Sequence, residues 1–103
     1  MENKYKLEIY PLAQKDMEQV FAYIAHKLGN PKSAEKQIND FEEALQHICK
    51  YPESCPLINN IYVKDQNVRK LIVNKYIVFY RVFDGRVQVI RVLHKLQNYV
   101  ALL

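Results

Sequence analysis

The sequence predicts an α+β fold: a two-layer sandwich of element order βααβββ, in which a helical hairpin packs on a mainly antiparallel four-stranded sheet. Three observations predict it. Residues 67–99 contain three apolar segments separated by two-residue turns, which is typical of an antiparallel meander. Residues 13–50 hold two helical patterns joined by a short link, and residues 4–10 supply a fourth strand. We expect a single domain over residues 1–103.

The first expected element is a half-buried strand over residues 4–10. Tyr5, Leu7 and Ile9 occupy every second position, which is the period of a strand with one buried face. Pro11 ends it, because proline has no backbone N–H to donate to a strand ladder. The edge of the sheet at which this strand pairs does not follow from the sequence.

Two amphipathic helices are expected next, since apolar residues recur at steps of three and four. The first stripe is Ala13, Met17, Val20, Phe21, Ile24, Ala25 and Leu28. Gly29 is typical of a C-terminal cap, and Asn30 followed by Pro31 is typical of a helix start. The second helix should run from Pro31 to about Lys50. Its expected apolar stripe is Ala34, Ile38, Phe41, Leu45 and Ile48, and its expected solvent-facing residues are Lys36, Gln37, Asp40, Glu42 and Glu43.

Two tight turns divide the meander. Asn74 and Lys75 form the first, and Asp84 and Gly85 form the second. Asx residues and glycine tolerate the positive φ that such turns require. The second turn is the stronger signal, because Lys75 carries a Cβ that resists left-handed geometry. Turns this short exclude a crossover helix, so the three strands should be antiparallel.

The middle strand is apolar on both faces, although an antiparallel sheet with one solvated face should alternate. One alternating set is Tyr76, Val78, Tyr80 and Val82, and the other is Ile77, Phe79, Arg81 and Phe83. The second face should therefore be covered. The C-terminal tail or a partner is one candidate cover. The other is the irregular segment over residues 51–66, which begins where Tyr51-Pro52 ends the second helix.

Composition is that of a globular protein, with half of the residues hydrophobic and a quarter charged. The N-terminus lacks the apolar core of a signal peptide, and no apolar run approaches the ~20 residues of a membrane span. Cys49 and Cys55 are interpreted as small apolar residues of a reduced, cytoplasmic protein. We expect no metal site and no cofactor.

Charge is distributed unevenly along the chain. Residues 1–66 contain eight Lys or Arg and ten Asp or Glu, for a net charge of −2. Residues 67–103 contain seven Lys or Arg and one acid, Asp84, for a net charge of +6. A one-sided basic surface attracts polyanions and acidic protein partners, and otherwise serves as a solvated face.

The ordered motifs of the chain resemble those of RelE/ParE-superfamily toxins over essentially its whole length. They begin with Tyr5, Leu7, Ile9, Pro11, Ala13, Asp16 and Met17, followed by Tyr23-Ile24, Asn30-Pro31 and Tyr51-Pro52. They continue with Arg69-Lys70-Leu71, the segment 76–82, Arg91-Val92-Leu93-His94-Lys95 and Tyr99. The resemblance implies the growth-inhibiting toxin of a bacterial type II toxin–antitoxin module. It also implies a cognate antitoxin, and the basic C-terminal third suits an acidic amphipathic partner segment.

The resemblance leaves two mechanisms open. RelE-like members cleave mRNA on the ribosome without a metal, and in that case His94, Tyr99 and Arg81 would be the catalytic residues. The chemistry requires proton transfer and cations around the phosphate, and His94 has a side chain suited to acid or base work near neutral pH. The side chains available for binding are Arg69, Lys70, Arg91 and Lys95.

One departure favours the other branch. RelE-like enzymes resemble Tyr-Arg-hydrophobic-hydrophobic-Tyr in the middle strand, whereas this chain has Ile77 in place of the arginine. Arg81 lies four residues further on, about 13 Å along a strand, and cannot make the same contact. The long helical hairpin is similar to the ParE-like branch, whose members inhibit DNA gyrase by binding. We therefore favour gyrase inhibition, with ribosome-dependent mRNA cleavage as the alternative.

Overall fold

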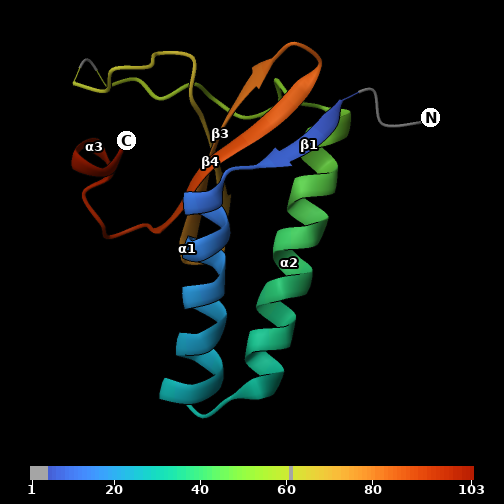
Figure 1. Ribbon diagram of the computed structural model, residues 1–103, viewed down its shortest axis with the longest axis vertical. Coiled ribbons are helices and arrows are strands. Elements are labelled where there is room, and N and C mark those ends of the chain that lie inside the picture. The colour runs from blue at the N-terminus through green and yellow to red at the C-terminus, as the bar shows by residue number, and fades with distance from the viewer. Residues whose placement is uncertain (1–4, 61) are drawn as a thin grey trace.

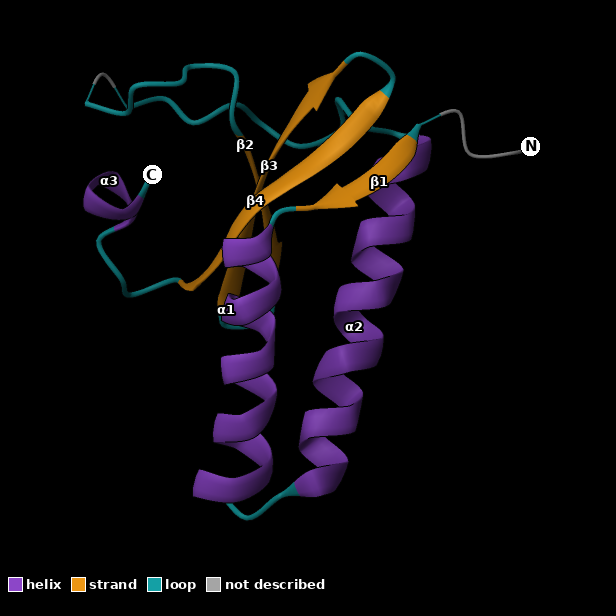
Figure 2. Ribbon diagram, viewed as in Figure 1, coloured by secondary structure: helices purple, strands orange, loops and turns teal. Residues whose placement is uncertain are grey.

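A computed structural model describes residues 5–60 and 62–103 and confirms the predicted α+β sandwich (Figure 1, Figure 2). The strands are β1 (Lys6–Ile9), β2 (Arg69–Val73), β3 (Tyr76–Phe83) and β4 (Arg86–His94). The helical elements are α1 (Pro11–Ala22), the π-helical turn η1 (Tyr23–Lys27), α2 (Pro31–Lys50) and α3 (Tyr99–Leu102). Figure 1 shows α1 and α2 side by side as a hairpin that extends well beyond the sheet.

The sheet has the strand order β1-β4-β3-β2. The β2–β3 and β3–β4 pairs are antiparallel, as predicted, while β1 is parallel to β4 and places Leu7 opposite Val87. The first strand therefore takes the β4 edge. Both predicted turns are present, with positive φ at Asn74 (58°), Asp84 (53°) and Gly85 (72°). These backbone angles explain why Asx residues and glycine occupy the turns.

Local caps fix the helical hairpin. Gly29 has a φ of 62°, and the Asn30 side chain accepts a hydrogen bond from the Ser33 backbone N–H at 3.1 Å. The sequence did not predict that the first helix ends in a π turn, in which the Leu28 N–H donates to the carbonyl of Tyr23 at 3.1 Å. Each residue of a π turn advances less around the axis than in an α-helix. The assignment of Leu28 to the buried stripe was therefore wrong: it is 59% exposed.

Apolar residues gather on both faces of the sheet. The larger core lies between the sheet and the hairpin: Ala13, Met17, Phe41, Leu45, Ile48, Cys49, Val73, Val78, Tyr80, Val87, Val89 and Val92. The core on the second face consists of Ile58, Val63, Val68, Phe79 and Leu93, with Ile77, Ile90, Tyr99, Val100 and Leu103 packed against it. The second face is thus covered by the irregular segment and the C-terminal tail together.

Two further expectations need correction. Gln37, expected on the solvent side of α2, is only 7% exposed. It lies three residues after Ala34 and four before Phe41, both of which are buried, so it occupies the centre of the stripe. Leu7 is 43% exposed because β1 is a short strand at the edge of the sheet. The C-terminal tail contains the short helix α3, which no sequence pattern indicated.

Candidate functional site

Arg81 lies in a row of hydrogen bonds that crosses the second face of the sheet. Its guanidinium donates to Gln88 Oε1 at 2.8 Å, to Asp65 Oδ2 at 2.9 Å and to the Tyr10 hydroxyl at 2.9 Å. Gln88 in turn donates to Glu8 at 2.8 Å. Hydrogen bonds to Tyr10 and then to Asp65 raise the pKa of Arg81. The row joins β1, β4 and β3 to the irregular segment, so Arg81 has a structural role.

Arg91 is held by Asp16 of α1. Its guanidinium donates to both carboxylate oxygens, at 2.8 and 3.0 Å, and its third contact is the Leu102 carbonyl at 3.3 Å. Asp16 also accepts from the backbone N–H of Val92 at 3.0 Å, which satisfies β4 where β1 no longer covers its edge. The hydrogen bond that Arg91 donates to Asp16 raises the pKa of Arg91. This bidentate pair connects α1, β4 and α3.

Arg69 forms hydrogen bonds with the segment that follows α2. Its guanidinium donates to the carbonyl of Cys55 at 2.7 Å and to that of Glu53 at 3.4 Å. The same segment receives the Tyr80 hydroxyl, which donates to the carbonyl of Pro52 at 2.8 Å. Burial raises the pKa of that phenol. Arg69 therefore stabilises the cover of the second face.

The structure does not bring His94 and Tyr99 together. The His94 ring lies on the helix-facing side of the sheet, 5.5 Å from the ring of Tyr76, and its Nδ1 accepts from the Leu96 backbone N–H at 3.1 Å. The Tyr99 ring packs on Phe79 at 5.2 Å in the core of the second face. The two side chains thus occupy opposite faces of the sheet.

Lys70 and Lys95 are the remaining binding candidates. Lys70 is half-buried on the edge strand β2, and Lys95 is exposed just after β4. Within residues 5–60 and 62–103, neither ammonium group takes part in an ion pair. Both are therefore available for contacts with another molecule.

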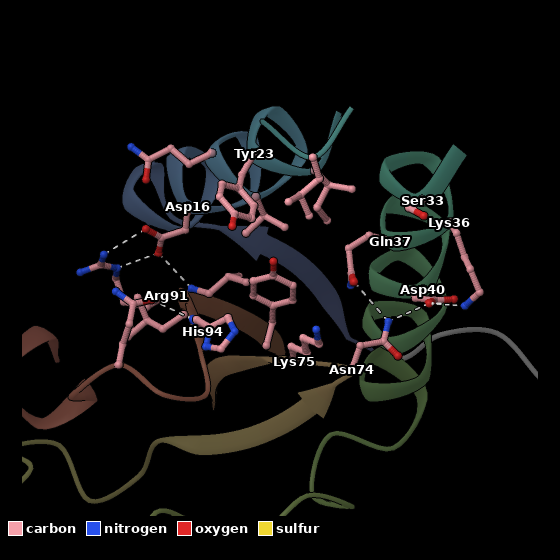
Figure 3. A pocket seen from close by; sticks show the side chains of 18 residues that line it. Asp16, Tyr23, Ser33, Lys36, Gln37, Asp40, Asn74, Lys75, Arg91 and His94 are labelled. Atoms are coloured by element: carbon pink, nitrogen blue, oxygen red, sulfur yellow. Dashed lines mark hydrogen bonds and ion pairs between the residues drawn. The ribbon is translucent and has the colours of Figure 1, made fainter. Parts of the chain in front are cut away.

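A cavity of about 830 Å³ opens where the hairpin meets the turn between β2 and β3 (Figure 3). At one end, Figure 3 shows Asp16 and Arg91 facing each other. At the other end, Asn74 of the turn donates to Gln37 and Asp40 of α2, and Lys36 donates to Asp40. Its wall is partly apolar, with contributions from Val20, Ile24, Tyr76 and Val92. A volume of this size is typical of small-molecule pockets, which range from about 300 to 1,000 Å³.

Among the residues that the structure describes, no group of three or more His, Cys, Asp or Glu side chains could hold a metal ion. In the same part of the chain, none of the helices has the length and apolar character needed to cross a membrane. Cys49 and Cys55 are free thiols, and burial raises the pKa of Cys49.

Comparison with known proteins assigns the fold and the ordered motifs to a family. Residues 7–99 match the family model described as the ParE toxin of the type II toxin–antitoxin system, parDE. The chain belongs to the ParE toxin family. It is thus a toxin of a type II toxin–antitoxin module, and the resemblance to the ParE-like branch is confirmed.

A solved structure has the same fold as this ParE-family chain. It is described as the chromosomal ParDE toxin–antitoxin system from P. aeruginosa, and the TM-score is 0.73 at 17% sequence identity. The match covers 90% of this chain and 98% of the other. The search of curated protein sequences found no match.

Sequence reasoning missed the partners of the arginines and the residues of the cavity. Asp16 was noted only as part of a motif, and Asp65 and Tyr10 were assigned no role. Their contacts join positions more than 15 residues apart, which no local pattern reveals. Gln37 could have been found, because its spacing from Ala34 and Phe41 places it on the buried face of α2.

Proposed function

We propose that this ParE-family toxin inhibits DNA gyrase by binding it, without cleaving RNA, and that a cognate antitoxin neutralises it in the bacterial cytoplasm. The separation of His94 and Tyr99 carries the proposal. Groups that transfer protons in one reaction must reach the same substrate atoms. The Tyr99 ring is packed against Phe79 on one face, whereas His94 lines the cavity on the other.

The ion pairs of Arg81 and Arg91 also support a toxin that does not cleave RNA. Arg81 and Arg91 are each engaged by a carboxylate, from Asp65 and Asp16 respectively. To serve as phosphate clamps, both would have to leave these partners, and breaking the mostly buried Arg91–Asp16 pair costs about 3 kcal/mol. Stabilisation of a transition state requires groups that are already oriented and available. The contacts with gyrase are instead assigned to the accessible lysines, Lys70 and Lys95.

Exposed apolar residues support the antitoxin part of the proposal. Leu12, Tyr23 and Leu28 all lie on the first arm of the helical hairpin and are at least half exposed. Large apolar side chains at a surface are typical of protein interfaces. An acidic amphipathic segment would cover them while its charges face the basic C-terminal third. Co-expression with the cognate antitoxin should therefore restore growth.

A pulse induction in bacteria tests the target directly. Incorporation of labelled thymidine should fall before that of labelled methionine, and the purified toxin should inhibit supercoiling by gyrase. The double variant His94→Ala/Tyr99→Phe should remain toxic if it folds. An early fall in methionine incorporation, followed by loss of toxicity in the folded double variant, would support the ribosome-dependent nuclease instead.

Charge reversal tests the binding surface. Lys70→Glu with Lys95→Glu should weaken gyrase inhibition at least about tenfold, because it converts two attractive contacts into repulsive ones. Lys50→Glu, at the exposed end of α2, is the matched control and should retain inhibition. If the double variant inhibited gyrase as strongly as the Lys50→Glu control, the gyrase contact would lie elsewhere on the toxin.

A further inference from the structure

Gln37 is a buried amide with one end satisfied. It is 7% exposed, and its Oε1 accepts a hydrogen bond from Asn74 Nδ2 at 3.3 Å. Its Nε2 has no acceptor among residues 5–60 and 62–103, although Gln37 lines the cavity. Buried donors without acceptors are rare in folded proteins because each lacks the hydrogen bonds it would make in water.

The orientation of this amide is fixed by its neighbours. Asn74 Nδ2 also donates to Asp40 Oδ2 at 2.8 Å, and Lys36 donates to the same oxygen at 2.9 Å. The hydrogen bonds from Lys36 and then Asn74 lower the pKa of Asp40, so this carboxylate remains an acceptor only. Asn74 must therefore present its NH₂ group, Gln37 must present its oxygen to Asn74, and Gln37 Nε2 is left as a donor without an acceptor in the described chain, on a side chain that lines the cavity.

The two carboxylates that line the cavity, unlike Gln37 Nε2, have hydrogen-bond partners within the described chain. Asp16 is engaged by Arg91 and the Val92 N–H, as described, and Asp40 is engaged by Lys36 and Asn74. Both carboxylates that line the cavity therefore already have donors within the chain.

His94 and Lys75 supply two further donors to the lining of the cavity. His94 accepts through Nδ1 from Leu96, so the proton of its neutral ring is on Nε2, which makes that nitrogen a donor. Lys75 lines the cavity and makes no ion pair within the described parts of the chain. Gln37, His94 and Lys75 thus offer a ligand an amide, an imidazole and an ammonium, and all three donate. The cavity is also lined by the hydroxyls of Tyr23, Ser33 and Tyr76 and by the amides of Gln19 and Gln97, which can donate as well.

We propose that this cavity binds a small amphipathic anion whose carboxylate accepts from Gln37, His94 and Lys75 and whose apolar body lies on Val20, Ile24 and Tyr76. The donors match the acceptor oxygens of a carboxylate, and the apolar wall matches a hydrocarbon or aromatic body. The site is separate from the gyrase proposal, because it concerns a ligand of the toxin itself. Its test measures binding and is independent of toxicity.

Octanoate is a suitable probe, with 1-octanol and inorganic phosphate as matched controls for its two halves. The probes are titrated into the ¹⁵N-labelled full chain and followed by amide chemical shifts. We expect octanoate to saturate one site with a Kd on the order of 1 mM or tighter, as suits a ligand of this size. The shifts should centre on Gln37, Asn74, Lys75 and His94. Phosphate and 1-octanol should bind at least about tenfold more weakly.

Variants of the donor complete the test. Gln37→Leu keeps the volume and removes the donor, and Gln37→Glu keeps an acceptor for Asn74, removes the donor and adds a negative charge. Both should weaken octanoate binding at least about tenfold, while Lys75→Gln should weaken it about threefold. Lys50→Gln lies outside the cavity and should bind as the natural chain does.

Four outcomes would overturn the proposal. One is the absence of saturable shifts, and another is a set of shifts centred away from the cavity. The third is equal binding of octanoate by the natural chain and a folded Gln37→Leu variant, which would mean that Gln37 Nε2 bonds only water. Equal affinity for 1-octanol would likewise reduce the cavity to an apolar pocket without a carboxylate site.

Discussion

Two glutamines, one on each side of the sheet, are both 7% exposed but differ in their hydrogen bonds. On the second face, Gln88 accepts from Arg81 and donates to Glu8, both at 2.8 Å. On the hairpin side, Gln37 accepts from Asn74 and its NH₂ group has no acceptor in the described chain. The comparison teaches that burial of a polar residue does not indicate its role. The completeness of its hydrogen bonds does.

The same difference holds for the two faces as wholes. On the second face, the Arg81 row and the packed segments satisfy the polar groups within the chain. On the hairpin side, the cavity retains donors at Gln37, Lys75 and His94. The second face is therefore structural throughout, whereas the hairpin side combines the larger core with a cavity that can bind a ligand. Five substitutions test this division.

Phe79→Ala should have the largest effect. Phe79 is fully buried in the second core, and its ring contacts that of Tyr99. Removing it should lower the free energy of unfolding by about 4 kcal/mol and release the C-terminal tail. Urea denaturation measures the loss, and hydrogen exchange in α3 measures the release. Phe83→Ala is the control, since Phe83 is 64% exposed. An equal loss in both variants would mean that the second face is not a core.

Asp16→Ala should follow. The substitution leaves Arg91 without its carboxylate and the Val92 N–H without its acceptor, in a place where both ionic side chains are mostly buried. We expect a loss of about 3 kcal/mol in the free energy of unfolding by urea denaturation. Glu18→Ala on the same helix removes an exposed carboxylate and should change stability by less than about 0.5 kcal/mol. A small loss for Asp16→Ala would show that β4 does not depend on this edge contact.

Gln88→Leu tests the satisfied member of the comparison. It removes the acceptor of Arg81 and the donor to Glu8 and leaves both groups partly buried without that partner. The free energy of unfolding should fall by about 2 kcal/mol. Thermal and urea unfolding should agree on this loss if unfolding is two-state. A neutral result would mean that the row is rearranged easily, and the contrast between the two faces would weaken.

How far the sequence predicted the molecule depends on the range of the interactions. The hairpin, its caps and the two turns were predicted because single residues determine them: Gly29, Asn30, Asn74, Asp84 and Gly85. The meander was predicted for the same reason, because its turns are too short for any other pairing. The parallel position of β1 next to β4 depends on contacts across the whole chain and was left open.

The candidate site was predicted less well. The sequence drew attention to Arg81 and Arg91 because of their charge, and the structure engages both with distant carboxylates. It assigned Gln37 to solvent because glutamine is usually exposed, and a residue that departs from the local pattern is often a functional one. His94 was noted, but its separation from Tyr99 depends on how the tail folds over the second face.

The stability of the protein at low pH tests the role of Asp40, whose carboxylate orients Gln37 through Asn74. Because its folded-state pKa is lowered from 3.8, Asp40 contributes stability that is complete above that value and is lost as pH falls through the lower one. Asp40→Asn should therefore show a flatter decline in stability between about pH 6 and about pH 2.5. The effect should be smaller than that of Gln88→Leu, because Asp40 lies at the rim. Urea unfolding across this range measures it, and parallel declines would contradict the assignment.

Gln37→Leu should have the smallest effect and the most informative one. Leucine fills a similar volume and removes a buried donor that lacks an acceptor, while Asn74 keeps its bond to Asp40. The free energy of unfolding should stay the same or rise by up to about 1 kcal/mol, in contrast to the loss in Gln88→Leu. The same urea denaturation measures both variants. A loss of about 2 kcal/mol for Gln37→Leu would mean that its NH₂ group is satisfied in solution, and the two faces would then be alike. A neutral or stabilising result would mean that the amide does not contribute to folding, which is the expected behaviour of a group whose acceptor arrives with a ligand.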